Sequence, residues 1–541
     1  MKMSFAVQLL KRFCGSKFKT RKDGFMLEVA NIFSDRMVLQ REKEVAVWGY
    51  AEPGEMVSVS IQGKCEKTKV KQDGSWNILL PPLKVSENEM LLIQTKDDIR
   101  RFVDVAIGEV WIAGGQSNME FPICYEKYYR EEKDICNKNL RFFDVPEICY
   151  EEQRRAYDYS KVGIWREACG EDLKYFSAVG YYFQKELIEQ LSVPVGIIGC
   201  NWGGTCSCAW MDEKTVKQVG EPWIARYESA MQGYDVKSYW DKQYLNPANN
   251  TGNPCMDPFS AFVLPQTRSM EEMIGWFMEM AGVSDAPDAV DINKNMMEFS
   301  AMIEPKAKPG CLFEYMVRPI APFTVRGVLW YQGESDDIPG LQGLYQSMLT
   351  GLIKDWRMAW QDMTLPFLLV QLPGYKAWMQ INNNDFVTIR NCQEKVADHV
   401  PNVYLASISD VGEEYDIHPK NKKIVGHRLA LLARKYIYGE NLLCEAPRAE
   451  KAERRGSRIV VDFKNAGKTL RVIGSEISAL KVKSSGKDIE YTAYVEGNQM
   501  FIMLKQDIEG TVQIEFAQTS WYLVNVFNEN DIPAVPFQMY C

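Results

Sequence analysis

The hydrophobic periodicity of the chain changes twice, and this change constrains the fold more than any other feature. From about residue 27 to 104, apolar and polar residues alternate in short bursts such as EVAVWGYA and MVSVSIQG, with turn signals between the bursts. Alternation with a period of two, broken by frequent turns, predicts antiparallel strands packed as a β-sandwich. The same alternation returns beyond about residue 441, in segments such as SRIVVDF and TVQIEFA, and predicts a C-terminal all-β module.

The middle of the chain has a different pattern. Beyond Val110, short apolar runs predict strands buried on both faces of a sheet, and amphipathic stretches between several of them predict helices. Buried strands that alternate with helices are typical of a parallel α/β sheet. The strand runs are VWIAGG, VPVGIIGCNWGG, VRGVLWYQGE, PFLLVQLPG and NVYLASISD, and the helical stretches are SAVGYYFQKELIEQL, GLYQSMLTGLIKDWRMAW and KNKKIVGHRLALLARKYI.

Length and pattern together predict several domains, because 541 residues exceed what one hydrophobic core usually supports. We expect a basic N-terminal arm over residues 1–26, a β-sandwich over 27–106, an α/β domain over 107–440 and a β-domain over 441–541. Residues 211–308 are polar and rich in methionine, and they interrupt the rhythm of strands and helices. We expect this segment to be a loop-like insertion at the rim of the sheet.

Composition limits the partners and the compartment. The formal net charge of −9 argues against nucleic acid and anionic membranes as partners. The sequence contains no run of about 18 apolar residues, so it predicts no membrane-spanning helix. The apolar stretch SFAVQLL is cut short by Lys11 and Arg12, unlike the core of a secretory signal. A cytoplasmic location is therefore favoured over a periplasmic or secreted one.

The 14 cysteines are scattered along the chain. They include one CxC pair, Cys206 and Cys208, but no spacing typical of a zinc site. A chain of this length does not need disulfides for stability, so we expect free, partly buried thiols in a reducing compartment. No cluster of residues predicts a metal or a cofactor.

Glycine-rich polar motifs follow three of the predicted buried strands. Ligands bind outside the carboxyl ends of the strands in open α/β sheets, so these motifs are expected to converge on one site. Ser117 follows two glycines at a strand end and can present its hydroxyl in a tight turn, although a serine nucleophile needs a base. A helix N-cap is the structural alternative for the same residue. The motifs are WIAGGQSNME, GCNWGGT and WYQGESD, and a fourth polar cluster, EEYDIHPKNK, precedes the last predicted helix.

Only three histidines could serve as the base. His427 falls inside a predicted helix among Lys and Arg residues, and His399 falls near a predicted helix end, where a capping role suffices. His418 is flanked by Asp416 and Pro419 in a predicted loop. Loops on a rigid scaffold carry chemistry more often than helix faces do. We therefore expect His418 to be the base.

Two of the motifs can supply hydrogen-bond donors. Gln332 and Gly333 follow the predicted strand VRGVLWY, and Gly203-Gly204-Thr205 follows IIGCNW. Side-chain amides and glycine N–H groups at a strand end can hold a developing oxyanion. A plain strand-to-helix turn is the alternative for either motif.

The motifs GQSNM, NWGGT, WYQGES and DIHP, in this order, resemble the sialate O-acetylesterase and acetylxylan esterase branch of the SGNH hydrolases. The similarity extends to TIRNCQ, DIHPKNKKIVGHRLA and VNVFNENDIPAVPF, and it covers nearly the whole chain from about Leu27, apart from the middle insertion. The resemblance implies an α/β fold of the flavodoxin-like, three-layer SGNH hydrolase type with flanking all-β domains. It also implies a serine esterase that needs no metal or cofactor and removes O-acetyl groups from a carbohydrate substrate.

The resemblance also implies roles by position in the motifs. Ser117 would be the nucleophile and His418 the base. The N–H groups of Ser117 and Gly204 and the side chain of Gln332 would hold the oxyanion.

The acid of the triad stays open between two residues. Standard SGNH enzymes carry an acid three residues before the histidine, where this chain has Tyr415. Asp416 lies only two residues before His418, and this spacing departs from the pattern. In related acetylxylan esterases the glutamate of the QGE motif takes the role, which in this chain is Glu334. Glu334 is favoured and Asp416 is the alternative.

The favoured function is therefore a sialate O-acetylesterase. The first alternative keeps the chemistry and changes the sugar to acetylated xylan or another plant polysaccharide. The second alternative is a non-catalytic carbohydrate-binding protein on the same scaffold. Such a protein would have lost the nucleophile or the base, and neither Ser117 nor His418 is lost.

Overall fold

The computed structural model of the chain describes residues 20–21, 24–151, 163–174, 176–236, 304–376 and 386–541. These residues divide into two compact units. Unit 1 contains the described residues up to 236 together with 304–329 and 350–367, and unit 2 contains 330–349 and the described residues from 368 to 541.

Two predicted segments lie largely outside the described residues. Of the basic arm over 1–26, the structure describes the end, where β1 (Thr20–Arg21) pairs with β2 (Gly24–Phe25). Of the expected insertion over 211–308, it describes both ends. The first end is helical rather than loop-like, with α7 (Glu213–Val219) and α8 (Glu221–Met231), because Asp212 caps the first helix and a glycine separates the two.

The alternating N-terminal residues of unit 1 form strands in two sheets. One sheet has three antiparallel strands in the order β3-β5-β8. In the other, β6 pairs with β7 and β9, and β9 and β4 both pair with β10 (Ile99–Gly115). The remaining bounds are β3 (Glu28–Val29), β4 (Val38–Gln40), β5 (Val45–Tyr50), β6 (Met56–Ile61), β7 (Lys64–Lys69), β8 (Ser75–Leu80) and β9 (Ser86–Gln94).

Strand β10 is 17 residues long and continues from the N-terminal strands into the parallel sheet of unit 1. Its first half pairs antiparallel with β9, and residues 109–115 pair in parallel with β13 (Val195–Asn201). Residues 105–115 are all buried, as expected for a strand covered on both faces. The predicted domain boundary between residues 106 and 107 therefore falls inside one continuous strand.

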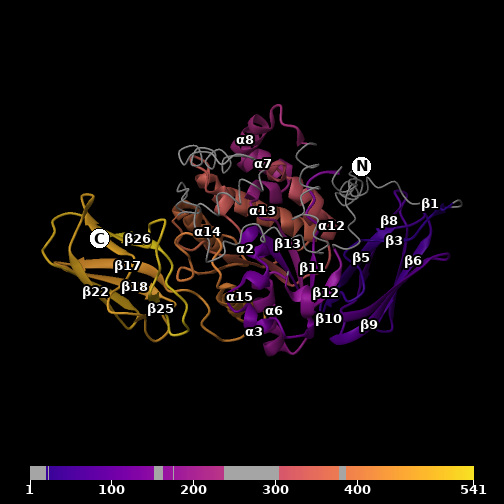
Figure 1. Cartoon of the computed structure of the whole chain (residues 1–541), viewed down its shortest axis with the longest axis horizontal. Coiled ribbons are helices and arrows are strands. Elements are labelled where there is room, and N and C mark those ends of the chain that lie inside the picture. The colour runs from indigo at the N-terminus through magenta and orange to yellow at the C-terminus, as the bar shows by residue number, and fades with distance from the viewer. Residues whose placement is uncertain (1–19, 22–23, 152–162, 175, 237–303, 377–385) are drawn as a thin grey trace, which may run out of the picture. The chain divides into compact units, whose positions relative to one another are not determined.

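Figure 1 labels the strands of the parallel sheet of unit 1. Their order in the sheet is β12-β11-β13-β10. Strand β11 (Asn137–Asp144) is parallel to β13, and β12 (Trp165–Ala168) is an antiparallel edge strand. Helix α6 (Ala178–Leu191) begins at the N-cap Ser177 and packs on β11 and β13. An edge-to-face contact between Trp111 and Phe183 joins β10 to this helix, with ring centroids 5.1 Å apart.

A buried carboxylate fixes the middle of β10. Glu109 is fully buried and accepts hydrogen bonds from Arg41 Nε at 2.6 Å and from Arg326 Nε at 2.7 Å. Burial alone would raise the pKa of Glu109, but the two guanidinium groups hold it below its usual value. A buried charge of this kind is tolerated only while its partners remain, so loss of either arginine is expected to destabilise unit 1 strongly.

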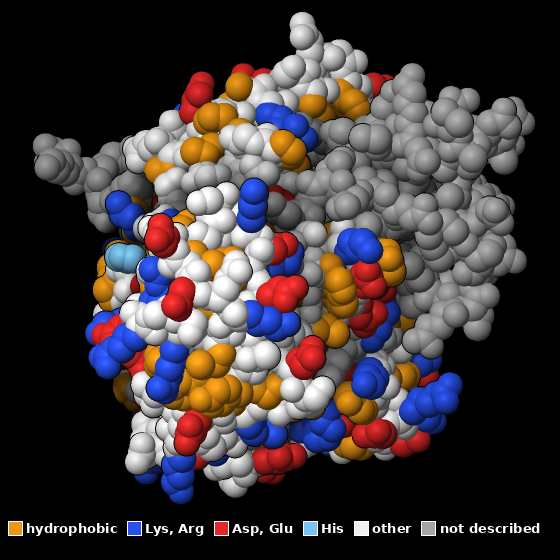
Figure 2. All heavy atoms as spheres, turned by 90° about the vertical axis from the view of Figure 1, so that its left-hand side faces the viewer, with side chains coloured by type: hydrophobic (Ala, Val, Ile, Leu, Met, Phe, Trp, Pro, Cys, Tyr) orange, Lys and Arg blue, Asp and Glu red, His pale blue; other side chains and the backbone are white. Residues whose placement is uncertain are grey.

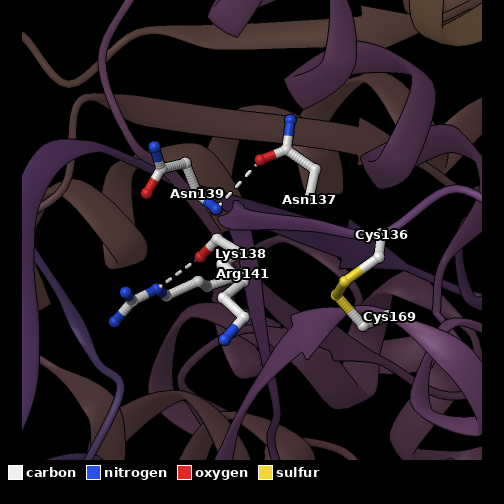
Figure 3. The surroundings of a disulfide bond; sticks show 6 residues. All are labelled: Cys136, Asn137, Lys138, Asn139, Arg141 and Cys169. Atoms are coloured by element: carbon white, nitrogen blue, oxygen red, sulfur yellow. Dashed lines mark hydrogen bonds between the residues drawn. A yellow bond between two sulfur atoms is a disulfide. The ribbon is translucent and has the colours of Figure 1, made fainter.

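One expectation from the sequence is wrong. Cys136 and Cys169 form a disulfide rather than two free thiols (Figure 3). The antiparallel register pairs Asn137 at the start of β11 with Ala168 at the end of β12, so the two neighbouring cysteines face each other. This pairing depends on a register that cysteine spacing does not reveal. The other cysteines of the described ranges carry thiols, as predicted.

Unit 2 contains the end of β14 (Gly327–Tyr331), followed in sheet order by β15 (Phe367–Val370) and β16 (Val403–Ala406). Helices α14 (Val387–His399) and α15 (Lys422–Tyr436) both pack on β16. Helix α13 (Tyr345–Trp360) begins in unit 2 and ends in unit 1. The strands and helices predicted for the middle of the chain are thus present.

The C-terminal residues of unit 2 form further all-β sheets around their own apolar core. Two antiparallel sheets have the orders β17-β18-β23-β22 and β21-β20-β24-β26, and β19 pairs with β25. Alternation along β18 and β24 buries every second side chain, as the sequence predicts. The bounds are β17 (Arg448–Arg455), β18 (Arg458–Lys464), β19 (Arg471–Val472), β20 (Leu480–Ser484), β21 (Lys487–Asp488), β22 (Tyr491–Glu496), β23 (Gln499–Leu504), β24 (Val512–Phe516), β25 (Val526–Phe527) and β26 (Phe537–Tyr540).

The face of the molecule in Figure 2 carries Lys and Arg side chains interspersed with Asp and Glu. Charged side chains form pairs in the C-terminal sheets, among them Lys483 with Glu515 at 2.7 Å and Lys505 with Glu490 at 2.9 Å. No helix of the described ranges is long and apolar enough to cross a membrane. The structure confirms a mixed α/β protein with additional all-β sheets, while the flavodoxin-like three-layer arrangement stays a prediction.

Candidate active site

Ser117 lies in a tight turn at the end of a buried strand. Strand β10 ends at Gly115, whose φ of 141° is a conformation that favours glycine, and helix α2 (Ser117–Glu120) begins two residues later. The carbonyl oxygen of Gln116 accepts the N–H groups of Met119 and Glu120 at 2.8 and 3.0 Å, which closes the turn. Ser117 is partly exposed, whereas its neighbours in the turn are buried, so the turn presents the serine.

The turn after β13 lies directly against Ser117 in unit 1. The Trp202 N–H donates to the carbonyl oxygen of Gly115 at 3.2 Å, which joins the ends of β13 and β10. A β-carbon at position 203 would lie 3.3 Å from Cβ of Ser117, so glycine permits the close approach. Gly204 has a φ of 71°, again a conformation that favours glycine. Unit 1 therefore brings Ser117 and the Gly203–Gly204 turn together.

A group of carboxyl side chains borders this turn, and sequence reasoning missed it. We call Glu120, Asp144 and Glu147 the carboxyl cluster. Burial raises the pKa of both Glu120 and Glu147, the two share a hydrogen bond, and the charge of Asp144 raises both pKa values further. Lys306 opposes these shifts, and its Nζ pairs with Glu304 at 2.8 Å. The sequence offered one signal: Glu120 directly follows the GQSNM motif.

In unit 2, the side chain of Gln332 is held on two sides. It follows β14 directly and is fully buried. Its Nε2 donates to Asp336 Oδ2 at 2.5 Å, and its Oε1 accepts the hydroxyl of Tyr345 at 3.1 Å. The amide is therefore oriented by its neighbours, with its NH2 group toward Asp336. A short 3-10 helix (Glu334–Asp336) follows Gly333 and places the buried Glu334 two residues after Gln332.

His418 is buried in the loop between β16 and α15, with 6% of the residue exposed. Burial lowers the pKa of His418 to about 3, Lys422 and Lys420 lower it too, and Asp416 opposes the shift. The imidazole is therefore neutral at neutral pH, which is the form that a general base requires. A pKa this low makes a weak base, so proton transfer to His418 requires a carboxylate that stabilises the imidazolium as it forms.

Asp416 is engaged by other partners around His418. Its Oδ1 accepts the backbone N–H of His418 at 2.8 Å, and its Oδ2 pairs with Lys420 Nζ at 2.7 Å. The distance from Asp416 Oδ1 to His418 Nδ1 is 3.8 Å, which is too long for a hydrogen bond. Asp416 thus shapes the loop and does not bind the ring in this structure.

Lys422 is a second residue that sequence reasoning missed, because it falls in a run of lysines at the start of α15. It is fully buried, and its Nζ lies 5.3 Å from the centre of the Tyr331 ring. Burial lowers the pKa of Lys422 to about 7, whereas Glu334 and Asp416 act in the opposite direction. The charges of both candidate acids, Glu334 and Asp416, therefore raise the pKa of Lys422 against the effect of burial.

The other two histidines lie where the sequence predicted. His399 is the last residue of α14, and its Nδ1 lies 2.7 Å from the carbonyl oxygen of Lys395 in the preceding turn. His427 lies in the second turn of α15 and is partly exposed. Of the predicted site residues, unit 1 holds Ser117 and Gly204, and unit 2 holds Gln332, Glu334, Asp416 and His418. In the described part of the chain, no group of three or more His, Cys, Asp or Glu side chains is placed to hold a metal ion.

Comparison with known proteins gives one consistent result. Residues 301–435 match a family described as a carbohydrate esterase, sialic acid-specific acetylesterase. A sialate O-acetylesterase from Mus musculus is 29% identical over 474 residues, which cover 80% of this chain and 78% of the relative. The sialate O-acetylesterase from Homo sapiens is 28% identical over 472 residues, which cover 80% and 75%.

A solved structure extends the similarity to the fold. A carbohydrate acetylesterase from Xanthomonas citri superposes with a TM-score of 0.71 at 26% identity, and the match covers 95% of this chain and 99% of that chain. Together, these matches confirm the family resemblance predicted from the sequence and the prediction of a carboxylic-ester hydrolase.

Proposed function

We propose that this chain, a carboxylic-ester hydrolase similar to the sialate O-acetylesterases, removes O-acetyl groups from sugars by serine catalysis, with O-acetylated sialic acids as its substrates. The matched family and the named relatives support both the ester bond and the sugar. We place the chemistry in an SGNH hydrolase domain of the flavodoxin-like type over residues 107–440, flanked by β-domains over 27–106 and 441–541.

The observation that carries the proposal is the arrangement around Ser117. The serine is presented by a tight turn at the carboxyl end of a buried parallel strand, and the glycine turn after the neighbouring strand lies against it. Ligands of open α/β sheets bind at this end of the strands. Backbone N–H groups beside a serine hydroxyl are the donors that an acyl-transfer reaction needs for its oxyanion.

In the proposed mechanism, Ser117 attacks the acetyl carbonyl carbon while His418 takes the hydroxyl proton. The tetrahedral oxyanion is held by the N–H groups of Ser117 and Gly204 and by the side chain of Gln332. Collapse releases the sugar hydroxyl, which takes the proton from His418, and leaves an acetyl-serine. Water then attacks the acetyl-serine with His418 as base, and acetate leaves.

For the acid of the triad we favour Glu334. Asp416 already accepts the backbone N–H of His418 and binds Lys420, and its carboxylate lies 3.8 Å from the ring nitrogen. Glu334 follows a buried strand and is itself buried, so it starts from a more rigid support. A triad carboxylate fixes the tautomer of the histidine and stabilises the imidazolium that forms.

The test is a direct comparison of substrates. The purified chain and its Ser117→Ala variant are assayed on O-acetylated sialic acids and on acetylated xylo-oligosaccharides. We expect hydrolysis of both esters to require Ser117 and kcat/KM to be higher for the sialates. A higher kcat/KM for the xylo-oligosaccharides would overturn the proposed sugar, and activity of the alanine variant would overturn serine catalysis.

A further inference from the structure

The residues that hold the glycine turn in unit 1 have no role in the mechanism above. The turn needs support because Gly204 can donate to an oxyanion only if its N–H points toward the reacting atoms. Trp202 is fixed at both ends: its N–H binds Gly115, and its carbonyl oxygen accepts the Thr205 hydroxyl at 2.7 Å. Trp210 Nε1 in turn donates to Thr205 Oγ1 at 2.9 Å. Between these anchors lies the N–H of Gly203.

That N–H is bound by Glu120. The Gly203 N–H donates a short hydrogen bond to Glu120 Oε2, with the two atoms 2.6 Å apart. Glu120 ends the short helix that Ser117 begins, so the carboxylate and the serine belong to one rigid element. A β-carbon at position 203 would lie 3.3 Å from that same carboxylate oxygen. The contact therefore ties the nucleophile turn to the glycine turn.

Glu147 supports the carboxylate from the other side. The hydrogen bond between the two lowers the pKa of Glu120 and raises that of Glu147, so Glu147 keeps its proton and donates it to Glu120. The loop that carries Glu147 is attached to the same sheet edge, since the Val145 N–H donates to the carbonyl oxygen of Gly199 at 2.8 Å. Glu120 thus accepts one hydrogen bond from the turn and one from Glu147.

We propose that Glu120 is a positioning residue for the oxyanion site: its carboxylate, braced by the carboxyl group of Glu147, binds the N–H of Gly203 and so fixes the direction of the Gly204 N–H beside Ser117. This inference rests on the proposed function and deepens it. It assigns a role to two carboxyl groups that the proposed mechanism does not use.

The first test removes the acceptor. Glu120→Ala is expected to lower kcat on a small acetyl ester by about 10- to 100-fold with KM little changed, since loss of one oxyanion donor costs about 100- to 1,000-fold and misdirection costs less. Glu120→Gln keeps an oxygen that accepts the Gly203 N–H, so it should recover activity to within about 5-fold of wild type. Rates are normalised to the Ser117 that reacts with a fluorophosphonate probe, which counts folded enzyme.

Glu126→Ala is the matched control. Glu126 is a buried carboxyl residue of the same unit, and its Oε2 accepts the N–H of Tyr128 at the same 2.6 Å. Its loss should destabilise the unit in the same way, yet leave kcat per labelled serine within about 2-fold of wild type.

The second test uses pH. The groups that face Glu147 are Glu120 and Asp144, which keep its proton on, and Lys306 with its partner Glu304, which favours ionisation. As the pH rises, Glu120, whose pKa is raised to about 8, loses its proton first; a further rise removes the proton of Glu147 and its hydrogen bond, so kcat should fall at the alkaline end of the profile. Glu147→Gln keeps a donor that does not titrate, and it should remove the alkaline decline while Glu304→Gln retains it.

The outcomes separate this inference from the proposed function. An inactive wild type or an active Ser117→Ala variant would overturn the proposed function, and the inference with it. In a wild type that depends on Ser117, a Glu120→Ala variant no slower than Glu126→Ala would overturn the positioning role alone. So would a Glu120→Gln variant as slow as Glu120→Ala.

Discussion

The surroundings of Ser117 in unit 1 and of His418 in unit 2 are built in different ways. Around Ser117, main-chain hydrogen bonds hold the turn: the Trp202 N–H donates to Gly115, and the carbonyl oxygen of Gln116 accepts two N–H groups of its own turn. Around His418, side-chain charges hold the loop: Asp416 binds Lys420 at 2.7 Å, and Arg428 binds Asp410 at 2.6 Å. Main-chain geometry depends little on pH, whereas charged side chains titrate. We therefore expect the main-chain turn at Ser117 to persist as the pH falls, whereas the histidine loop should respond to acid; the Glu120–Glu147 contact beside the serine turn should respond to alkaline pH.

The largest losses of kcat should come from replacing the proton donor Ser117 or the proton acceptor His418. Ser117→Ala and His418→Ala should each lower kcat to less than about a hundredth of wild type, since loss of a triad member removes orders of magnitude. His399→Ala and His427→Ala should keep most of the activity, and the measurement is kcat on one acetyl ester. A variant at position 427 as slow as the one at 418 would assign the base to the other histidine.

The next comparison separates the two candidate acids of unit 2. Glu334→Gln should lose about 100-fold or more in kcat, while Asp416→Asn, which leaves a side-chain oxygen for the His418 N–H, should lose about 10-fold or less. KM should change little in both variants. A much greater loss for Asp416→Asn would give the triad role to Asp416 and leave Glu334 as a neighbour of Gln332.

The pH dependence of stability should show the contrast between the regions. The pKa of His418 is lowered to about 3 by burial from its usual value of 6.5, so the unfolded chain binds this proton first. Stability from this group is complete above about pH 6.5 and is lost as the pH falls toward 3. Between pH 7.5 and 5 the loss should be about 2 kcal/mol in the free energy of unfolding.

Urea unfolding of wild type and His418→Gln at both pH values isolates this contribution, because all other groups titrate in both proteins. The variant should lose about 2 kcal/mol less than wild type over this interval. Equal losses would mean that His418 is solvated in solution, and the contrast between the two regions would weaken.

The smallest effect should come from the support of Gln332. Asp336→Asn can place an NH2 group against the NH2 of Gln332, which would turn the amide and lower kcat about 10-fold. Asp337→Asn is the matched control: Asp337 is equally buried and accepts the N–H of Phe386 at 3.1 Å instead. Steady-state kcat and KM of both variants decide the matter, and equal values would show that Asp336 does not orient the amide.

What the sequence could reveal follows from how local each feature is. Ser117, Gly204 and Gln332 stand in glycine-rich motifs directly after apolar runs, and both signals lie within a few residues. The carboxyl cluster depends on where β11 ends, and that strand aligns Asp144 with Gly199, 55 positions along the chain. No local pattern reports such a register.

The same reason explains the other omissions. The Cys136–Cys169 disulfide follows from the pairing of β11 with β12. Lys422 resembles its solvated neighbours in sequence and differs only in being buried. Features set by long-range packing therefore had to come from the structure, whereas motifs at strand ends did not.

The unbroken run of β10 has a practical consequence for anyone shortening this protein. A fragment that starts at residue 107 would cut the strand in the middle. It would lack Arg41, whose N–H donates to the carbonyl oxygen of Gly108, and it would lose the hydrogen bond from the Ala106 N–H to the carbonyl oxygen of Met37. The exposed edge of β10 could then pair with strands of other molecules, which favours aggregation. Because one backbone serves β9 and β13, hydrogen exchange in these two strands should report a single opening event.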